Sequence, residues 1–176
     1  MNHLQRCIAD VGGVARASEL YARGHPAWEL RMLSEYGRII RVRKGWYANA
    51  DTAPQLLRAW RVGGRLACVS ALVHYGLVES HPSDEPYGRI EPLDAVSRLH
   101  VGITIGSSRL RHPDNHRERL APQQDDAVVL HWIASEPSPH GDRTRRLIVP
   151  LETALDQAMV CRPRTTTAWS LARDTL

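Results

Sequence analysis

The sequence lacks the features that mark membrane-spanning, secreted and disulfide-bonded proteins. No apolar run approaches the roughly 20 residues that a membrane-spanning helix needs. Residues 1–10 lack the apolar core of a signal peptide, so we expect a cytoplasmic protein that does not enter a membrane. The three cysteines, Cys7, Cys68 and Cys161, form an odd set without a CxxC pair, which favours reduced thiols in the core.

Lysine is almost absent as well, since Lys44 is the only lysine in the chain. The metal-dependent core of a restriction-type nuclease usually ends in a lysine two residues after an acid, whereas Lys44 stands between Arg43 and Gly45. The chain also has no GxSxG, P-loop or GxGxxG motif. We therefore expect no catalytic site and no cofactor, and we expect that the protein is not an enzyme.

The excess of positive charge is concentrated at one end of the chain. Residues 1–50 carry eight arginine or lysine residues against four acidic residues, an excess equal to the net charge of +4 of the whole chain. A basic segment in an otherwise balanced chain is typical of a phosphate-binding unit. A solvated basic face without a ligand gives the same pattern, so both interpretations stand.

Residues 38–47 have the pattern of a tight, basic β-hairpin. Apolar and cationic residues alternate up to Arg43, as in a strand with one buried face. Lys44-Gly45 suits the turn, because glycine tolerates a positive φ. Trp46-Tyr47 begins the returning strand with aromatic residues that favour β structure.

Three short helices are predicted before this hairpin, at residues 4–11, 17–23 and 27–36. A tight turn that contains glycine joins the second and third helices, as a helix-turn-helix requires. A helix-turn-helix followed by a basic hairpin is a winged helix. Residues 1–50 are therefore predicted to form a winged helix-turn-helix DNA-binding domain.

The rest of the chain is predicted to contain a helical connector (51–78), a loop or linker rich in proline and acids (79–95) and a small α+β domain (96–176). The expected elements are helices at 54–62, 67–77, 150–160 and 165–176 and strands at 97–105, 127–134 and 145–149. The fold class is therefore predicted to be α+β, with the winged helix followed by a small mixed domain that ends in helices.

Two motifs in the N-terminal part carry a resemblance to a known family. They are Gly12-Gly13-Val14-x-Arg16-x-Ser18-x-Leu20 and Leu30-x-x-Leu33-x-x-x-Gly37-Arg38-Ile39-Ile40-Arg41-Val42-Arg43-Lys44-Gly45-Trp46-Tyr47-Ala48. Together they resemble the N-terminal domain of AbiEi-type antitoxins, which belong to type IV toxin–antitoxin systems. The same module opens a group of actinobacterial proteins that end in a very-short-patch-repair-like nuclease domain. Further segments are similar to that group, at 67–77, 99–101, 109–111, 129–132 and 150–156.

The resemblance implies a DNA-binding transcriptional regulator that represses its own promoter through the winged helix. It implies a nucleotidyltransferase-like toxin, encoded nearby, as a partner in addition to double-stranded DNA. Because a single winged helix covers only a few base pairs, we expect a homodimer or paired sites on DNA.

The residues expected to contact DNA are outward-facing side chains of the helix-turn-helix and the cations of the hairpin. They are Ser18, Trp28, Arg31, Met32, Arg38, Arg41, Arg43 and Lys44. Arginine on the third helix reads guanine in the major groove, whereas hairpin cations more often contact phosphates or a narrow minor groove. Trp28 fits a half-buried core position equally well, and Ser18 also fits a helix cap.

A second basic cluster and several histidines also have a functional and a structural interpretation. Arg109 and Arg111 are predicted to be an auxiliary contact to DNA or to a partner, unless they belong to a solvated loop. His112 and His116 have the spacing of a helical metal-binding pair, but the intervening proline favours a loop, so no metal site is expected. Two further histidines are interpreted as core or rim residues of strands, His100 and His131.

Two other functions fit the same sequence. One is the DNA-targeting portion of a very-short-patch-repair-like endonuclease that lacks its catalytic domain. The other is a protein-interaction module whose winged helix no longer binds DNA. A reading frame that continues past Leu176 into clustered acids with lysine, glutamine or glutamate would favour the endonuclease.

Overall fold

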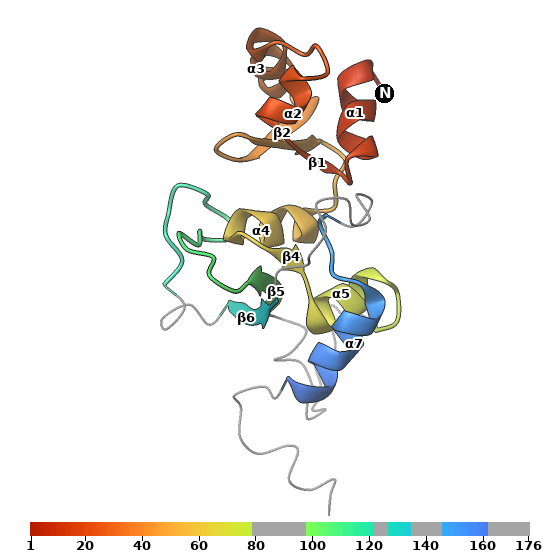
Figure 1. Cartoon of the computed structure of the whole chain (residues 1–176), viewed down its shortest axis with the longest axis vertical. Helices are drawn as coiled ribbons and strands as arrows, with labels where there is room; N and C mark the ends of the chain where they lie inside the picture. Colours follow the sequence, from red (N-terminus) through yellow and green to blue (C-terminus); the bar gives the residue numbers. More distant parts are fainter. Residues whose placement is uncertain (79–97, 122–126, 135–145, 162–176) are drawn as a thin grey trace, which may run out of the picture.

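The computed structural model describes residues 1–78, 98–121, 127–134 and 146–161. Over these ranges the chain has mixed α+β structure, as predicted, in two units that are arranged along the long axis of the molecule (Figure 1). The linker predicted at 79–95 and the helix predicted at 165–176 lie outside the described residues. None of the helices in the described ranges is both long enough and apolar enough to cross a membrane.

The first unit combines three helices with a three-stranded antiparallel sheet. Its elements are α1 (His3–Asp10), β1 (Val14–Arg16), α2 (Ala17–Tyr21), α3 (Ala27–Glu35), β2 (Ile39–Arg43) and β3 (Trp46–Asn49). Strand β3 lies between β1 and β2 and pairs with both. The predicted helices and hairpin are confirmed. The segment 14–16 is an edge strand, because it pairs with β3.

Helical spacing of apolar residues builds the core of this unit. Its largest fully buried side chains are Leu4, Ile8, Leu20, Leu30 and Ile39. Helix α1 begins at a capping box in which Asn2 Oδ1 accepts the N–H of Gln5 and Gln5 Oε1 accepts the N–H of Asn2. The capping box stabilises the start of α1, and burial of apolar side chains packs the helices against the sheet.

A β-bulge interrupts the pairing of β2 with β3 between Arg41 and Arg43. Arg41 is opposite Tyr47 and Arg43 is opposite Trp46, so two successive residues of β2 meet one step of β3. Val42 stays buried, whereas Arg43 is half-buried with its guanidinium against Gly63. The strict alternation predicted for this strand is therefore broken at Arg43, since bulges redirect side chains.

The second unit is built around a short three-stranded sheet. Its elements are α4 (Pro54–Val62), β4 (Arg65–Leu66), α5 (Cys68–His74), β5 (Leu99–Thr104), β6 (Val128–Ile133) and α7 (Leu151–Val160). Strand β5 is antiparallel to β4 and parallel to β6. Helix α4 packs on β4 and β5, and α5 packs on β5 and α7. The segment 51–78 therefore supplies two helices and a strand to this unit.

The strand predicted at 145–149 is wrong over its described residues. This segment forms only a bridge between Ile148 and Leu66. Its partner β4 is two residues long, and the chain enters α7 directly after Pro150. The segment therefore has no room to extend into a regular strand.

Helix α4 joins the two units. In Figure 1 it lies between the first unit and the sheet of the second unit. Its Leu57 shares a buried cluster with Val42 and Ala48 of the hairpin. The rings of Trp46 and Trp60 meet edge to face with their centroids 5.0 Å apart and their planes at 72°. The hairpin is thus packed against the second unit along one side.

Candidate nucleic-acid interface

Helix α3 has an exposed face that carries three of the predicted contact residues. Trp28 is 60% exposed, which excludes the half-buried core position considered for it. Arg31 and Met32 are exposed as well. The neighbouring carboxylate of Glu29 lies 3.0 Å from Nδ1 of the buried His25. Glu29 is therefore paired with a core histidine, whereas the exposed face presents Trp28, Arg31 and Met32 together with the carboxylate of Glu35.

Ser18 lies in the first turn of α2 and is exposed. The N-cap position of this helix is Arg16, whose N–H donates to Oε2 of Glu19 at 2.7 Å. The interpretation of Ser18 as a helix cap is therefore wrong, because the helix begins before it. Its hydroxyl remains an exposed group near the N-terminus of α2.

Two of the hairpin cations, Arg43 and Lys44, meet the second basic cluster in one cleft of about 490 Å³. The cleft is lined by Arg16, Arg43, Lys44, Trp46, Trp60, Gly63, Arg109, Arg111 and His116. None of the described residues that line it is acidic. Arg109 and Arg111, which the sequence separates from the hairpin by more than sixty positions, thus belong to the same surface as Arg43 and Lys44.

Like charges are crowded in this cleft. Burial, and after it the nearby Arg111, lower the pKa of the Arg43 guanidinium. Burial also lowers the pKa of His116, and the surrounding arginines lower it further. Both shifts arise because the charged form of each group is desolvated and faces other cations. An anion that enters the cleft would relieve this repulsion, so the site is suited to a negatively charged ligand.

Aromatic rings form part of the same wall. The guanidinium carbon of Arg16 lies 4.9 Å from the centroid of the Trp46 ring, a cation–π contact. Trp46 in turn contacts Trp60. The cleft therefore combines cations with flat apolar surfaces, which is the combination that single bases and sugar-phosphate groups bind.

The predicted contact residues fall into two groups. Arg43, Lys44, Arg109 and Arg111 line the cleft, whereas Ser18, Trp28, Arg31, Met32, Arg38 and Arg41 do not. Arg38 and Arg41 are nevertheless exposed. In Figure 1 the β2–β3 hairpin lies between α3 and the green segment 105–121. The hairpin therefore lies between α3 and the segment 105–121 (Figure 1), and its Arg43, Lys44 and Trp46 form one wall of the cleft.

Sequence reasoning missed four side chains of the cleft, namely Arg16, Trp46, Trp60 and His116. Their roles depend on the contact between the two units. The spacing of residues within one segment of the sequence does not predict that contact. The basic character of Arg16 was visible in the sequence, but its place over the Trp46 ring was not.

No protein-family model matches the chain, and a search of curated proteins gives no significant match. The interface therefore rests on geometry, burial and charge.

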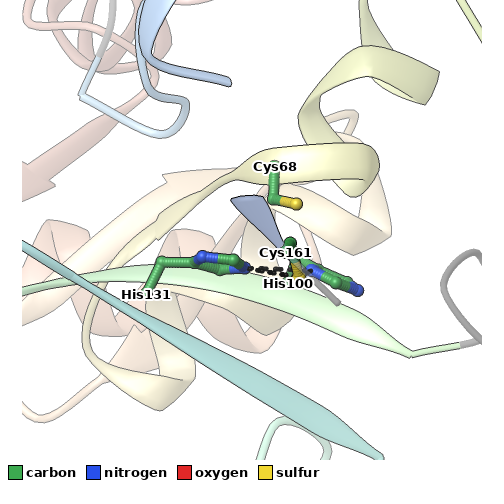
Figure 2. A group of neighbouring side chains, drawn as sticks. All are labelled: Cys68, His100, His131 and Cys161. Atoms are coloured by element: carbon green, nitrogen blue, oxygen red, sulfur yellow. Dashed lines mark hydrogen bonds between the residues drawn. The ribbon is translucent and has the colours of Figure 1, made fainter. Parts of the chain in front are cut away.

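Thiols and imidazoles gather at a second place, drawn in Figure 2. The cluster consists of Cys68, His100, His131 and Cys161. All three cysteines of the chain are reduced, but two of them belong to this cluster and are not isolated core thiols. Burial raises the pKa of the Cys68 thiol to about 12 and lowers the pKa of His131. Nδ1 of His112 accepts the N–H of Asp114, and His116 lines the cleft.

Proposed function

We propose that the chain is a transcriptional regulator that binds double-stranded DNA through a winged helix-turn-helix in residues 1–50. In this proposal α2 and α3 are the helix-turn-helix, α3 is the recognition helix and the β2–β3 hairpin is the wing. The observation that carries the proposal is the cleft in which cations of the hairpin meet cations of the second unit.

The cleft suits a nucleic-acid backbone for physical reasons. Five arginine or lysine side chains line it, and two indole rings lie among them. Arginine binds a phosphate with two parallel hydrogen bonds, and each neutralised phosphate releases condensed counterions. Arg43 and Arg111 repel each other, and a phosphate bound between them would be attracted to both guanidinium groups.

The exposed face of α3 and the basic surface of the wing and cleft would contact different parts of the DNA. The exposed face of α3 would enter the major groove, where Arg31 reads base edges and Trp28 and Met32 make apolar contacts. The wing and the cleft would follow the sugar-phosphate backbone and fix the register. Specificity is then expected from α3, and most of the salt-dependent affinity from the hairpin and the cleft.

Autorepression and an antitoxin role extend this proposal and rest on the family resemblance. A homodimer, or two copies on paired sites, would cover enough base pairs for repression. A nucleotidyltransferase-like toxin encoded nearby is the proposed protein partner. Neither partner is needed for the DNA-binding test that follows.

The test is a binding titration of the full chain against its own upstream region and against a scrambled duplex, each at two salt concentrations. The proposal expects tighter binding to the upstream region by about 10³ or more. Equal and steeply salt-dependent binding to both duplexes would favour the DNA-targeting portion of an endonuclease instead. Absence of binding to either duplex at low salt would contradict DNA binding and favour a protein-interaction module.

A further inference from the structure

We propose that Cys68, His100, His131 and Cys161 together bind one structural Zn²⁺ ion. The four residues come from four different elements: the start of α5, strand β5, strand β6 and the end of α7. Their ligand atoms all lie within 4.8 Å of one another (Figure 2). A bound ion would therefore cross-link most of the second unit.

The strand pairing places both histidines on one face of the sheet. In the parallel β5–β6 pair, Gly102 is the register partner of His131, and His100 precedes Gly102 by two residues. Register partners share a face, and so do residues two apart along a strand, so the two rings point the same way. Gly102 keeps this face open for close packing, because an added Cβ would lie 3.2 Å from Val149 and 3.4 Å from Ala67.

The distances within the cluster are close to those of a tetrahedral zinc site. Nδ1 of His100 lies 3.0 Å from Nε2 of His131, and Sγ of Cys161 lies 3.8 Å from each of these nitrogens. Zn–N bonds of about 2.0 Å and Zn–S bonds of about 2.3 Å give tetrahedral separations of about 3.3 Å for N···N and about 3.5 Å for S···N. Each of these three separations differs by about 0.3 Å, and Sγ of Cys68 lies within 4.8 Å of the other ligand atoms, so side-chain shifts would complete the coordination.

The donor set and its burial indicate which ion binds and what it does. Two thiolates and two imidazoles favour zinc over magnesium or calcium, which prefer oxygen ligands. Cys68 is 1% exposed and His100 is 2% exposed. Since the protein supplies all four ligands at a largely buried position, the site is closed and structural rather than catalytic.

The backbone around the cluster holds the ligands in position. The N–H of Cys68 donates to Oε1 of Gln157, and the N–H of Cys161 donates to the carbonyl oxygen of Gln157, so one residue of α7 holds the backbone of both cysteines. The N–H of His100 donates to Oγ of Ser70 at 3.0 Å. Cys68 has a φ of 49°, a left-handed conformation that residues other than glycine rarely adopt. Such strain persists where the surroundings fix it, and ligand sites are one such place.

A second group of similar residues offers a matched control. His3, Cys7 and His25 also place their ligand atoms within 4.8 Å of one another. However, His3 turns Nδ1 toward His25, at 3.1 Å, and Nε2 toward Cys7, at 3.9 Å. These two contacts use different nitrogens of His3, and among the described residues the group offers three donors instead of the four of a closed structural site.

The first test is the metal content of the purified full chain after expression in zinc-supplemented medium and desalting. We expect about one zinc per chain for the unmodified protein and for Cys7→Ser, and less than about 0.2 for the double variant Cys68→Ser/Cys161→Ser. Less than about 0.2 zinc in the unmodified protein would overturn the proposal. Loss of zinc from Cys7→Ser with retention in the double variant would overturn it as well.

The second test needs no variant and so does not depend on whether the double variant folds. X-ray absorption at the zinc edge of the unmodified protein is expected to show two sulfur ligands at about 2.3 Å and two nitrogen ligands at about 2.0 Å. A shell with one sulfur, or with oxygen ligands only, would contradict the assignment. None of the four ligands lines the basic cleft, so zinc content and DNA binding are separate readouts.

Discussion

The guanidinium of Arg146 donates hydrogen bonds to both carboxylate oxygens of Glu19, at 2.7 and 2.9 Å. Glu19 belongs to α2 in the first unit, and Arg146 lies shortly before α7 in the second. The same guanidinium donates to the carbonyl oxygen of Val14 at 3.3 Å. This pair therefore holds the two units together at a point separate from the contact between the hairpin and α4.

The ion pair predicts a specific loss of stability in acid. The hydrogen bond from Arg146 is the main reason why the pKa of Glu19 lies below its ordinary value of 4.5. A carboxyl with a depressed folded-state pKa stabilises the fold above the unfolded-state pKa, and this contribution disappears as the pH falls through the folded-state pKa. Glu19→Gln should cost about 1 kcal/mol at pH 7, a value in the range of partly exposed pairs, and almost nothing well below pH 4.5.

Urea unfolding of the unmodified chain and of Glu19→Gln at several pH values measures this difference. Glu35→Gln, which removes an exposed carboxylate from α3, is the control and should unfold like the unmodified chain. A stability difference for Glu19→Gln that does not shrink on acidification would show that the ion pair is not its cause.

The cleft predicts how the salt dependence of DNA binding is distributed. Arg109→Gln and Arg111→Gln together should weaken binding to any duplex and reduce the slope of log K against log salt by about one for each cation removed. Arg6→Gln removes one positive charge from the exposed side of α1, outside the cleft, and should leave the slope unchanged. An equal change in slope per charge removed in the two variants would mean that only net charge matters.

The α3 face predicts a different kind of effect. Arg31→Ala should reduce the preference for the upstream region over a scrambled duplex by about 1–3 kcal/mol, because it removes a base contact. Lys44→Gln in the hairpin turn should weaken binding to both duplexes alike. Competition titrations with the two duplexes separate these outcomes. If Arg31→Ala weakens binding to both equally, α3 does not read sequence.

Gly64 predicts a stability effect that comes from packing alone. An added methyl group there would overlap the carbonyl oxygen of Gly102 and lie 2.7 Å from Cδ1 of Ile103. Gly64→Ala should therefore destabilise the fold by about 2 kcal/mol or more, since the segment that leads into β4 must move away from β5. Gly24→Ala is the comparison: it has open space but a φ of +85°, and should cost about 1 kcal/mol. Chemical denaturation ranks the two, and the reverse order would contradict the packing argument.

The parts of the structure that the sequence predicted correctly depend on local patterns. Leu4 and Ile8 mark one face of a helix, and Lys44-Gly45 marks a two-residue turn between strands. The strand β4 could not be predicted, because Arg65–Leu66 is too short to show any period and its partner lies in β5. The break in alternation at Arg43 has the same origin, since a bulge depends on the register of the partner strand.

The candidate sites show the same limit. The basic hairpin was visible as a run of arginines, but the cleft exists only because Arg109 and Arg111 fold back beside it. The four residues of the proposed zinc site are spread from position 68 to position 161 without a recognisable spacing. Only the pairing of β5 with β6 and the packing of α5 on α7 bring them together.

The strand pairing also sets an order in which the chain can fold during synthesis. All pairings of the first sheet lie within residues 14–49, so they can form early. Strand β4 must wait for β5, and the bridge from Leu66 to Ile148 closes later still. At roughly 5–20 residues per second, Arg146 leaves the ribosome about 5–20 s after the hairpin. For much of that interval Arg109 and Arg111 have not yet joined the hairpin, so nearby nucleic acid can meet the hairpin before the cleft is complete.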